Sequence, residues 1–523
     1  MPLSPNSLAP AVGTAAKNVQ FQSFAEVLTR KNLIIGTYDP SITTLTDDEP
    51  VRVSSPDAAG ALTGFGFMLH RLAERFFDGS QGVETWLIPQ AEAGGATASA
   101  GDIDFTGSAL TVNGTLYLYI AGIQVPVVLA DGDDGDDIAL KVVAAITADN
   151  ALPVTAAVNG VTSGQVDFTS KSKGPWGDDI ELSFNEGFQE ALPAGVLAVV
   201  TGMTGGAGIP DIDDALTGLG TGDNQNENHY TDVVHGYGDD TSTLNKLSIY
   251  NGPGQEFSGN YDKLVARPFR VLTGDTTPGD SGLNALIAFG NSRRETDRTN
   301  GTIAAPGSPN HPAEIAAVAM GVASRLNSIR AEETTYERPL PGIYAGDKSE
   351  RWTDDYDNRD SAYKAGISPT LGKGGAVFLQ GLLTYYHPTS VPLTSNGYRS
   401  MRNVSIIQNM LHNGKLNFQQ EKWKGTSIVE DKSEVGSITS RQKARDKGDV
   451  LDDLLGLTDG FSDNAWIYNK GFTVDRLKAN LDSYIQIRSG GDGFTWILPV
   501  LLSGEGLIFD GLIQFDTALT VVL

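Results

Sequence analysis

The chain of 523 residues is 40% hydrophobic and 20% charged, which is typical of a folded protein of roughly two to four domains. Its net charge of −26 argues against a nucleic-acid partner, and the absence of cysteine excludes disulfides, thiol catalysis and cysteine-based metal sites. The sequence has neither the pattern of a signal peptide nor a run of about 18 apolar residues, so we expect no membrane insertion.

The two ends of the chain differ from its body. Residues 1–20 contain three prolines and no helical periodicity, which predicts an extended N-terminal arm. Residues 511–523 are mostly apolar and predict a C-terminal strand arm, which needs a sheet to join. We expect both arms to add strands to sheets of neighbouring subunits. The apolar side chains expected at these inter-subunit contacts are Leu3, Leu8, Val12, Leu512, Ile513, Phe515, Leu519, Val521 and Val522.

Residues 21–96 and 206–397 alternate strands with helices and predict one discontinuous α/β core. The expected strands are 32–36, 84–89, 230–235 and 269–273, and the expected helices are 55–77, 210–218, 281–290 and 312–327. This alternation predicts a mixed or parallel sheet that helices cover on both faces.

Residues 97–205 predict an inserted β-rich domain between the two halves of this core. The expected strands are 103–105, 116–120, 125–129, 154–158, 165–169, 180–184 and 196–200, with one helix at 136–148. The pair Asn113-Gly114 is typical of a tight hairpin turn. The segment has 14 acidic and 3 basic residues, a charge of −11, which fits a surface that faces solvent.

Residues 398–510 predict a C-terminal α+β domain, so that the whole chain reads as an α+β and α/β multidomain protein. The expected helices are 401–412, 441–455 and 474–484, and the expected strands are 496–502 and 507–523. A basic stretch between 415 and 447 is an exception in so acidic a chain. Its members are Lys415, Lys422, Lys424, Lys432, Arg441, Lys443, Arg445 and Lys447.

The sequence PGDSG at 278–282 is similar to the surroundings of the nucleophile in trypsin-like proteases. That chemistry needs a histidine base and an orienting carboxylate around the serine, and here Leu283 replaces the second glycine of the motif. We expect instead that Asp280 or Ser281 caps a helix over 283–289. A serine hydrolase that uses Ser281 with a distant histidine stays open as a competing hypothesis.

Five aspartates between 131 and 137 suggest a calcium loop, but the EF-hand pattern fails, because its fifth position is Gly135 and its twelfth is Val142. We expect the last of these aspartates to cap the following helix, whose N-terminus favours negative charge. The six histidines form no metal-binding pair, and His235 is expected to be structural. We therefore expect no catalytic residue, no metal and no cofactor, and hence no enzyme.

Several segments, in the same order over about 84–343, resemble the tail sheath proteins of contractile-tailed bacteriophages, in particular the Mu-like sheath group. They are ETWLIP at 84–89, GTLYLYIAG at 114–122, VPV at 125–127, LPVTAAV at 152–158, KG at 173–174, GDDI at 177–180, LPAGV at 192–196, GGAG at 205–208, PD at 210–211, DVVH at 232–235 and PLPGI at 339–343. Each segment is short, and their shared order carries the resemblance.

The resemblance implies a structural virion protein of the phage tail sheath that is made in the host cytoplasm. Many copies would stack as hexameric rings in a helical assembly around a tail tube protein, with baseplate and tail terminator proteins at the ends. Contraction would drive the tube through the host envelope during genome ejection. The arms would exchange strands between subunits, the β-rich insert would face outward, and the C-terminal domain would face the tube.

From the contrast with the acidic insert we also expect that part of the basic stretch meets an acidic tube surface. The residues expected to face the tube are Lys415, Lys422, Lys424, Arg441, Lys443, Arg445 and Lys447. A solvated helix face is the alternative for these residues. For the whole chain, the alternatives are a sheath of a phage-tail-like bacteriocin or another contractile injection system, the hydrolase, and a β-rich adhesin or surface-layer protein.

Overall fold

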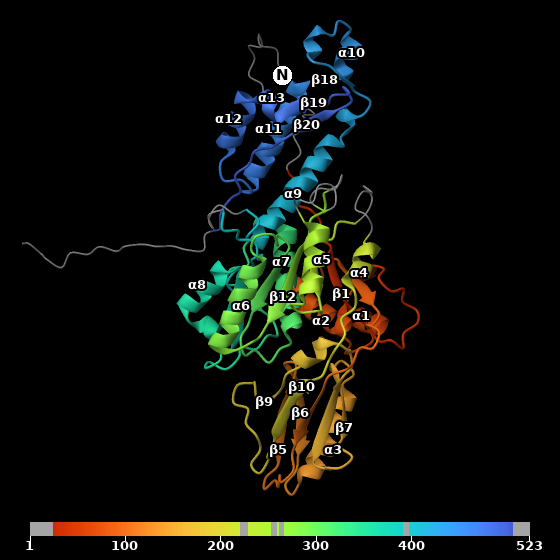
Figure 1. The fold of residues 1–523 in the computed structure, drawn as a ribbon, viewed down its shortest axis with the longest axis vertical. Helices are drawn as coiled ribbons and strands as arrows, with labels where there is room; N and C mark the ends of the chain where they lie inside the picture. The colour runs from red at the N-terminus through yellow and green to blue at the C-terminus, as the bar shows by residue number, and fades with distance from the viewer. Residues whose placement is uncertain (1–24, 220–227, 253–258, 261–265, 391–396, 506–523) are drawn as a thin grey trace, which may run out of the picture. The chain divides into compact units, whose positions relative to one another are not determined.

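A computed structural model describes residues 25–219, 228–252, 259–260, 266–390 and 397–505, and Figure 1 shows its helices and strands. These residues form two compact units. The main unit contains Val27–Lys415 and residues 504 and 505, and the C-terminal unit contains Leu416–Ser503 and residues 25 and 26. The five-part division predicted from the sequence stays a prediction.

The main unit is built on a nine-stranded mixed sheet with the order β14-β16-β15-β13-β12-β11-β1-β3-β2. Its strands are β1 (Asn32–Thr37), β2 (Val51–Val53), β3 (Thr85–Gln90), β11 (Asp232–His235), β12 (Arg270–Asp275), β13 (Asn300–Ala304), β14 (Pro339–Leu340), β15 (Ile367–Lys373) and β16 (Ala376–Leu379). The strands from β3 to β15 pair in parallel, and the outer strands pair antiparallel. Every residue of β1, β11 and β13 is buried, as in parallel sheets covered on both faces.

Helices cover both faces of this sheet (Figure 1). They are α1 (Pro56–Thr63), α2 (Met68–Ser80), α4 (Ile212–Gly218), α5 (Thr241–Asn251), α6 (Gly279–Arg293), α7 (Pro312–Ile329), the 3₁₀ turn η2 (Trp352–Asp354) and α8 (Tyr356–Lys364), whereas α9 (Met401–Phe418) begins at the amino edge of the sheet. Ile303 packs into the hydrophobic cluster that contains α2 and α7, whereas its neighbour Ala304 packs into the cluster of α6 and α8. Successive strand residues point to opposite faces, so the predicted mixed sheet with helices on both faces is confirmed.

Helices α2 and α7 pack closely because glycines lie where they cross. A methyl group on Gly79 would stand 2.3 Å from the carbonyl oxygen of Val318, and one on Gly321 would stand 2.5 Å from that of Phe76. The approach brings the two backbones together, and α7 buries almost every residue from Pro312 to Ser324. The centre of the main unit is therefore a helix pair laid on a parallel sheet.

Residues 100–204 interrupt the α/β elements between β3 and β11 and form two small sheets of their own, called here the β insert. One sheet has the order β10-β4-β8-β7 and the other β6-β5-β9. The elements are β4 (Ala100–Asp104), β5 (Gly114–Ile120), β6 (Ile123–Leu129), α3 (Gly135–Ala148), β7 (Val154–Val158), β8 (Gln165–Ser170), η1 (Pro175–Asp179), β9 (Leu182–Phe184) and β10 (Val199–Thr204). Their apolar side chains share one hydrophobic cluster with α3.

The C-terminal unit consists of short helices and two small two-stranded sheets. Its elements are η4 (Glu421–Trp423), β17 (Ser427–Ile428), η5 (Lys432–Glu434), α10 (Ile438–Lys443), β18 (Ala444–Arg445), α11 (Lys447–Asp463), α12 (Lys470–Ala479), α13 (Leu481–Tyr484), β19 (Ile485–Ile487) and β20 (Phe494–Trp496). Val450, Leu454, Leu477 and Ile485 are its fully buried apolar centre.

Two sequence predictions in the first half of the chain are wrong. The single helix expected over 55–77 is two helices, because Gly64 and Gly66 adopt left-handed backbone angles between α1 and α2. Asn113-Gly114 makes no hairpin. The tight turn lies between β5 and β6, where Ala121 and Gly122 both have positive φ, as a type I′ turn requires.

The expected caps and the C-terminal elements differ as well. Helix α6 begins at Gly279, before the predicted start, so neither Asp280 nor Ser281 caps it. The helix expected over 441–455 is divided, because β18 pairs with β17 and Asp446 then caps α11. The strand expected over 496–502 shrinks to β20, whose partner β19 is only three residues long. The strand expected over 507–523 lies outside the described residues.

The aspartate run caps the β insert helix as predicted, but the N-cap is Asp134 rather than one of the last two aspartates. The side chain of Asp134 accepts hydrogen bonds from the backbone of Asp136 and Asp137, and Asp137 completes a capping box. Because the oxygen of Asp134 satisfies free N–H groups of the first turn, the aspartate run has a structural purpose at this helix end.

Candidate functional site

The first place to look for a ligand in such a sheet is the carboxyl edge between β1 and β11, where the strand order reverses. After β1 the chain places β3 on one side, and it later places β11, β12, β13 and β15 on the other. Ligands of open α/β sheets bind in the crevice outside the carboxyl ends of the strands at such a switch point.

In this protein the side chain of Met68 fills that crevice. Its sulfur accepts a hydrogen bond from the backbone N–H of Thr37 at 3.4 Å. A methyl group on Gly236 would stand 2.3 Å from the same sulfur, and one on Gly36 would stand 3.1 Å from it. Met68 is 2% exposed. The position that usually holds a ligand is therefore part of the packed core.

His235 lies beside Met68 and is held by contacts within the fold. It is 1% exposed, its Nδ1 accepts the backbone N–H of Tyr237 at 3.2 Å, and its ring stacks on that of Tyr237. Burial lowers the pKa of His235 to about 4, so the imidazole is neutral at neutral pH.

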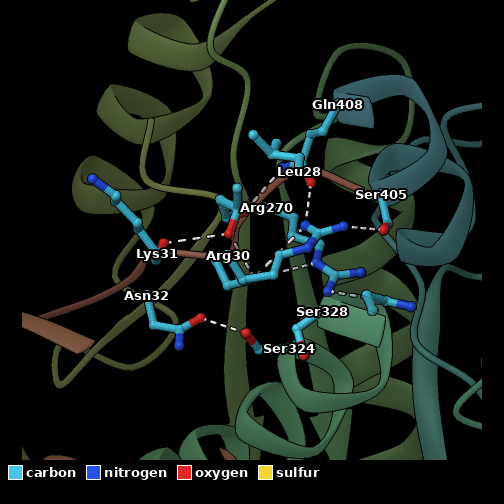
Figure 2. Close-up of polar contacts among 12 residues, drawn as sticks. Leu28, Arg30, Lys31, Asn32, Arg270, Ser324, Ser328, Ser405 and Gln408 are labelled. Carbon is cyan, nitrogen blue, oxygen red and sulfur yellow. Dashed lines mark hydrogen bonds and ion pairs between the residues drawn. The ribbon is translucent and has the colours of Figure 1, made fainter. Parts of the chain in front are cut away.

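The opposite, amino edge of the sheet carries a buried ionic network (Figure 2). Asp232, the first residue of β11, receives a hydrogen bond from Nε of Arg270, the first residue of β12. Nη1 of Arg30, just before β1, lies 3.8 Å from Asp232 Oδ2. None of the three side chains is more than 1% exposed. One buried carboxylate thus balances two buried guanidinium groups.

This network fastens α9 to the sheet. Arg30 also donates to the side chains of Ser405 and Gln408 on α9, as Figure 2 shows. Arg270 donates to the carbonyl oxygen of Met401 at 2.8 Å. The backbone N–H of Leu28 donates to Asn409 Oδ1 at 2.6 Å. Both the segment that leads into β1 and the helix α9 are therefore fixed at one point of the main unit.

The electrostatics follow from burial and from the two-to-one charge ratio. Burial works to raise the pKa of Asp232, but attraction to Arg270 and Arg30 outweighs it and holds the pKa below its ordinary value. Burial, together with repulsion from Arg270, lowers the pKa of Arg30 to about 10 despite the attraction of Asp232. Asp232 and Arg30 therefore both stay charged at neutral pH, and the hydrogen bonds of the network join the sheet to α9.

Half of the eight basic side chains between 415 and 447 form ion pairs with acidic neighbours in the C-terminal unit. Lys422 pairs with Asp453, Lys424 with Glu421 and Lys432 with Asp449. Lys447 pairs with Asp482 at 2.8 Å and lies 3.7 Å from Glu430.

The remaining cations differ in their surroundings. Arg441 donates to the carbonyl oxygen of Val435, and Arg445 donates to that of Lys422 and lies over the ring of Trp423. Lys415 lies on α9 in the main unit. Lys443 is exposed and has no ion pair among the described residues. Whether these residues face a tube stays a prediction.

The arm residues predicted at inter-subunit contacts, at 3, 8, 12 and 512–522, lie outside the described residues. The described part of the C-terminal unit contains a short two-stranded hairpin. Its strands β19 and β20 pair only with each other among the described residues. Ile485 is buried against α11, and Phe494 and Trp496 pack half-buried beside it.

The sequence did not predict the residues of the amino-edge network, nor Met68 in the crevice. The one local signal was a charged residue at the start of an apolar strand, as in Asp232-Val233-Val234 and Arg270-Val271-Leu272. No group of histidine, aspartate and glutamate side chains among the described residues could hold a metal ion. No helix in the described part of the chain is long and apolar enough to cross a membrane.

Comparison with known proteins gives one match at the level of sequence. Over 172 residues the chain is 37% identical to the Mu-like prophage FluMu tail sheath protein of Haemophilus influenzae. The chain is similar to a tail sheath protein. The match covers 33% of this chain and 34% of the relative, so the chain spans about a third of the length of the curated protein it matches. The resemblance to Mu-like tail sheath proteins predicted from the sequence is confirmed over this region. No family model matches the sequence.

Solved structures of sheath proteins resemble the chain over most of its length but only at low similarity. The sheath tail protein of Desulfitobacterium hafniense has 9% sequence identity and a TM-score of 0.43, covering 94% of this chain and all of that one. A sheath complex of an extracellular contractile injection system in the contracted state has 9% identity and a TM-score of 0.46, covering 98% of each chain. With TM-scores below one half, these similarities by themselves establish neither fold nor function.

Proposed function

We propose that the chain is the structural subunit of a contractile phage tail sheath and has no enzymatic activity. Copies of it assemble as stacked hexameric rings around a tail tube, and the stack contracts to drive the tube through the envelope of a bacterium. The observation that carries this proposal is the 37% identity to the FluMu tail sheath protein over 172 residues. Identity at this level over so long a segment reflects common descent.

The packed switch-point crevice supports a structural role over the serine hydrolase hypothesis. Met68 occupies the space in which an α/β enzyme of this topology holds its ligand. Ser281, the nucleophile of that hypothesis, lies in the first turns of α6. None of the five histidines with described hydrogen bonds has a serine hydroxyl as its partner.

The hairpin of the C-terminal unit supports assembly by strand exchange. An isolated two-stranded hairpin is marginally stable in water, and three or more strands are needed for independent stability. The pair β19 and β20 presents half-buried aromatic side chains and has free edges among the described residues. We propose that arm residues around 3–12 and 512–522 of neighbouring copies add strands to this hairpin.

The proposed partners are other copies of the chain, the tail tube protein, and the baseplate and tail terminator proteins at the ends of the sheath. The assembled protein belongs to the virion, and assembly takes place in the host cytoplasm. Contraction needs no fuel in this scheme, because two packings of the same subunits differ in free energy and their interfaces are bistable.

Negative-stain electron microscopy of the full chain expressed alone tests the proposal. We expect long hollow tubes of uniform width. If the chain alone stays monomeric, we expect tubes on co-expression with a tail tube protein from the same source. A chain that stays monomeric in both experiments would contradict the proposed function.

Truncation tests the arms separately. Deletion of residues 1–18 or of residues 512–523 is expected to leave a folded monomer that forms no tubes, because the described core of both units stays intact. Circular dichroism and thermal unfolding of each truncated chain are the controls for folding. A truncated chain that polymerises like the full one would show that strand exchange does not hold the assembly together.

A further inference from the structure

The four-stranded sheet of the β insert ends, among the described residues, in two edge strands of unusual composition that pair with no further strand. Its order is β10-β4-β8-β7, so that β10 and β7 are the edge strands. β10 reads VVTGMT and β7 reads VTAAV, and neither contains a charged residue or a proline. Edge strands of monomeric proteins are usually protected by charges, prolines or covering segments, because their free N–H and C=O groups pair readily with other strands.

In this sheet the charged residues lie on the central strands, whereas protected sheets carry them on the edge strands. One row of side chains runs from edge to edge through Thr201, Asp102, Asp167 and Ala157, as the strand registers show. The two aspartates lie on the central strands, where like charges directly opposite each other are destabilising. The edge residues of the same row are neutral. In a segment with a charge of −11, the carboxylates are thus kept away from the edges.

The opposite face of the sheet is apolar from edge to edge. Its matching row runs through Val200, Ile103, Val166 and Val158. Ile103 and Val166 are fully buried, whereas Val200 is 38% exposed and Val158 is half-buried. The core of the β insert therefore reaches both edges and is left partly uncovered at each of them, so a strand added at either edge would complete it.

The strand directions of the two edges are complementary. All neighbours in the sheet pair antiparallel, so four strands bring β10 and β7 to opposite edges in opposite directions. If β7 of one copy lies beside β10 of the next, the antiparallel pattern continues without a break, and both the neutral and the apolar row continue with it. Contacts of this head-to-tail kind repeat from copy to copy into a ring or a filament.

From these observations we infer that the β insert is an inter-subunit contact in its own right, in which β10 of one copy pairs with β7 of a second copy of this chain. The inference rests on the proposed self-assembly and adds a contact that involves neither terminal arm. Such a contact explains why the edge strands of this acidic segment carry no charge. The aspartates of two copies repel each other, and neutral edge strands let the copies pair without bringing carboxylates together.

Engineered cysteines provide the test, because the chain contains none of its own. The double variant Thr201→Cys with Ala157→Cys places one thiol on each edge, in the same row. Within one copy, the two edge strands are separated by three strand spacings of about 4.8 Å, roughly 14 Å, whereas a disulfide requires Cα atoms within about 7 Å. A disulfide between these positions can therefore form only between copies.

We expect a ladder of dimers and larger covalent species on non-reducing gels after mild oxidation of the full-length double variant. Each single variant should give no species above a dimer. The double variant Val199→Cys with Ala157→Cys tests the neighbouring register, since Val199 is on the same face and 67% exposed. The matched control is Val128→Cys with Ala157→Cys, because Val128 is 75% exposed but lies on β6 of the other sheet. This control should give no ladder.

The outcomes separate the inference from the proposed function. Pairing of two edges needs only two copies, so it can be detected in tubes and in concentrated solution alike. If neither register gives a ladder above the control, the edge pairing is overturned, whatever the chain assembles into. Tube formation by the unmodified chain is observed independently by electron microscopy, and its failure in the presence of the tube protein counts against the sheath assignment alone.

Discussion

Arg71 of α2 and Glu314 of α7 are joined by two parallel hydrogen bonds of 2.9 Å, from Nε to Oε1 and from Nη2 to Oε2. The side chains are 2% and 0% exposed. Arg75 adds a third bond, of 3.0 Å, to Oε2. Burial works to raise the pKa of Glu314, but attraction to Arg71 and Arg75 outweighs it and lowers the pKa below the ordinary value. This ionic contact joins two helices whose backbones approach closely at Gly79 and Gly321.

We expect Glu314→Gln to destabilise the main unit by about 3–5 kcal/mol, because removing one partner of a buried ion pair leaves an uncompensated buried charge. The matched control is Glu74→Gln. Glu74 also pairs with Arg71, but its side chain is 34% exposed, and its loss should cost less than about 1 kcal/mol. Urea unfolding of the two variants measures the difference. Equal losses of unfolding free energy in the two variants would contradict a larger contribution from the buried pair.

The crossing of α2 and α7 gives a second prediction. Gly321→Ala would place a methyl group 2.5 Å from the carbonyl oxygen of Phe76, where backbone cannot move aside easily. We expect a loss of about 1–3 kcal/mol, as for other overpacked cores. Gly94→Ala is the control, because nothing lies within 4 Å of the added methyl group there. Calorimetry should show a lower Tm for the first variant only.

The amino-edge network predicts a pH dependence. Asp232→Asn leaves two buried guanidinium groups without their carboxylate and should cost about 3–5 kcal/mol at pH 7. Because the pKa of Asp232 is lower in the folded protein than its unfolded value of about 3.9, its contribution is present above that pH and is lost as the pH falls towards the folded pKa.

Unfolding free energies of wild type and Asp232→Asn should therefore start to converge as the pH falls from about 5 through the unfolded pKa of about 3.9, and they should continue to converge below it. Asp213→Asn is the control, since Asp213 is 58% exposed in its pair with Lys246. A gap between wild type and Asp232→Asn that stays constant over this range would contradict a charged Asp232 in the fold.

The sequence predicts the sheet of the main unit because each strand has a local signal, a short apolar run. Apolar runs such as Leu33–Ile35 and Val233–Val234 alternate with helical segments, and that pattern alone specifies a covered parallel sheet. The candidate site could not be found in the same way. Arg30 meets Gln408 across 378 positions of sequence, and only the strand order brings them together.

The same reasoning explains the errors. The apolar spacing of a helix continues across Gly64 and Gly66, so it predicts one helix there. Both glycines have positive φ in the structure, and two such residues end a helix. Asn113-Gly114 has the composition of a tight turn, but Ala121-Gly122 makes the turn, because the registers of β5 and β6 place the chain reversal there. Tertiary pairing overrides local turn preference in this case.

His235 predicts a loss of stability in mild acid. Its folded pKa of about 4 lies below the unfolded value of about 6.5, so the unfolded chain takes up the proton first. Stability should fall as the pH drops through 6.5 and stop falling below about 4, by up to about 3 kcal/mol for this group. His235→Asn keeps an acceptor for the N–H of Tyr237 and should show a shallower decline between pH 7 and 5 in urea titrations.

The contacts within the basic stretch decide which residue should be mutated to test contact with a tube. Reversing Arg445 or Lys447 breaks contacts inside the C-terminal unit, so a defect would have two explanations. Lys443→Glu changes an exposed charge without an ion pair among the described residues and should leave the Tm unchanged. If Lys443 faces an acidic tube, co-expressed sheaths should assemble without a tube or in contracted form. Normal extended sheaths would exclude this contact, and Glu434→Lys on the exposed turn η5 is the control for surface charge.

The methionine between β1 and β11 has a thermodynamic consequence for the whole main unit. A protein that binds a small molecule in its switch-point crevice gains stability in proportion to the logarithm of the ligand concentration. Here the space is filled by Met68, a covalent part of the chain, so through this crevice no change in metabolite level can stabilise or loosen the fold. The packing at this point is completed when the chain folds and needs no bound molecule.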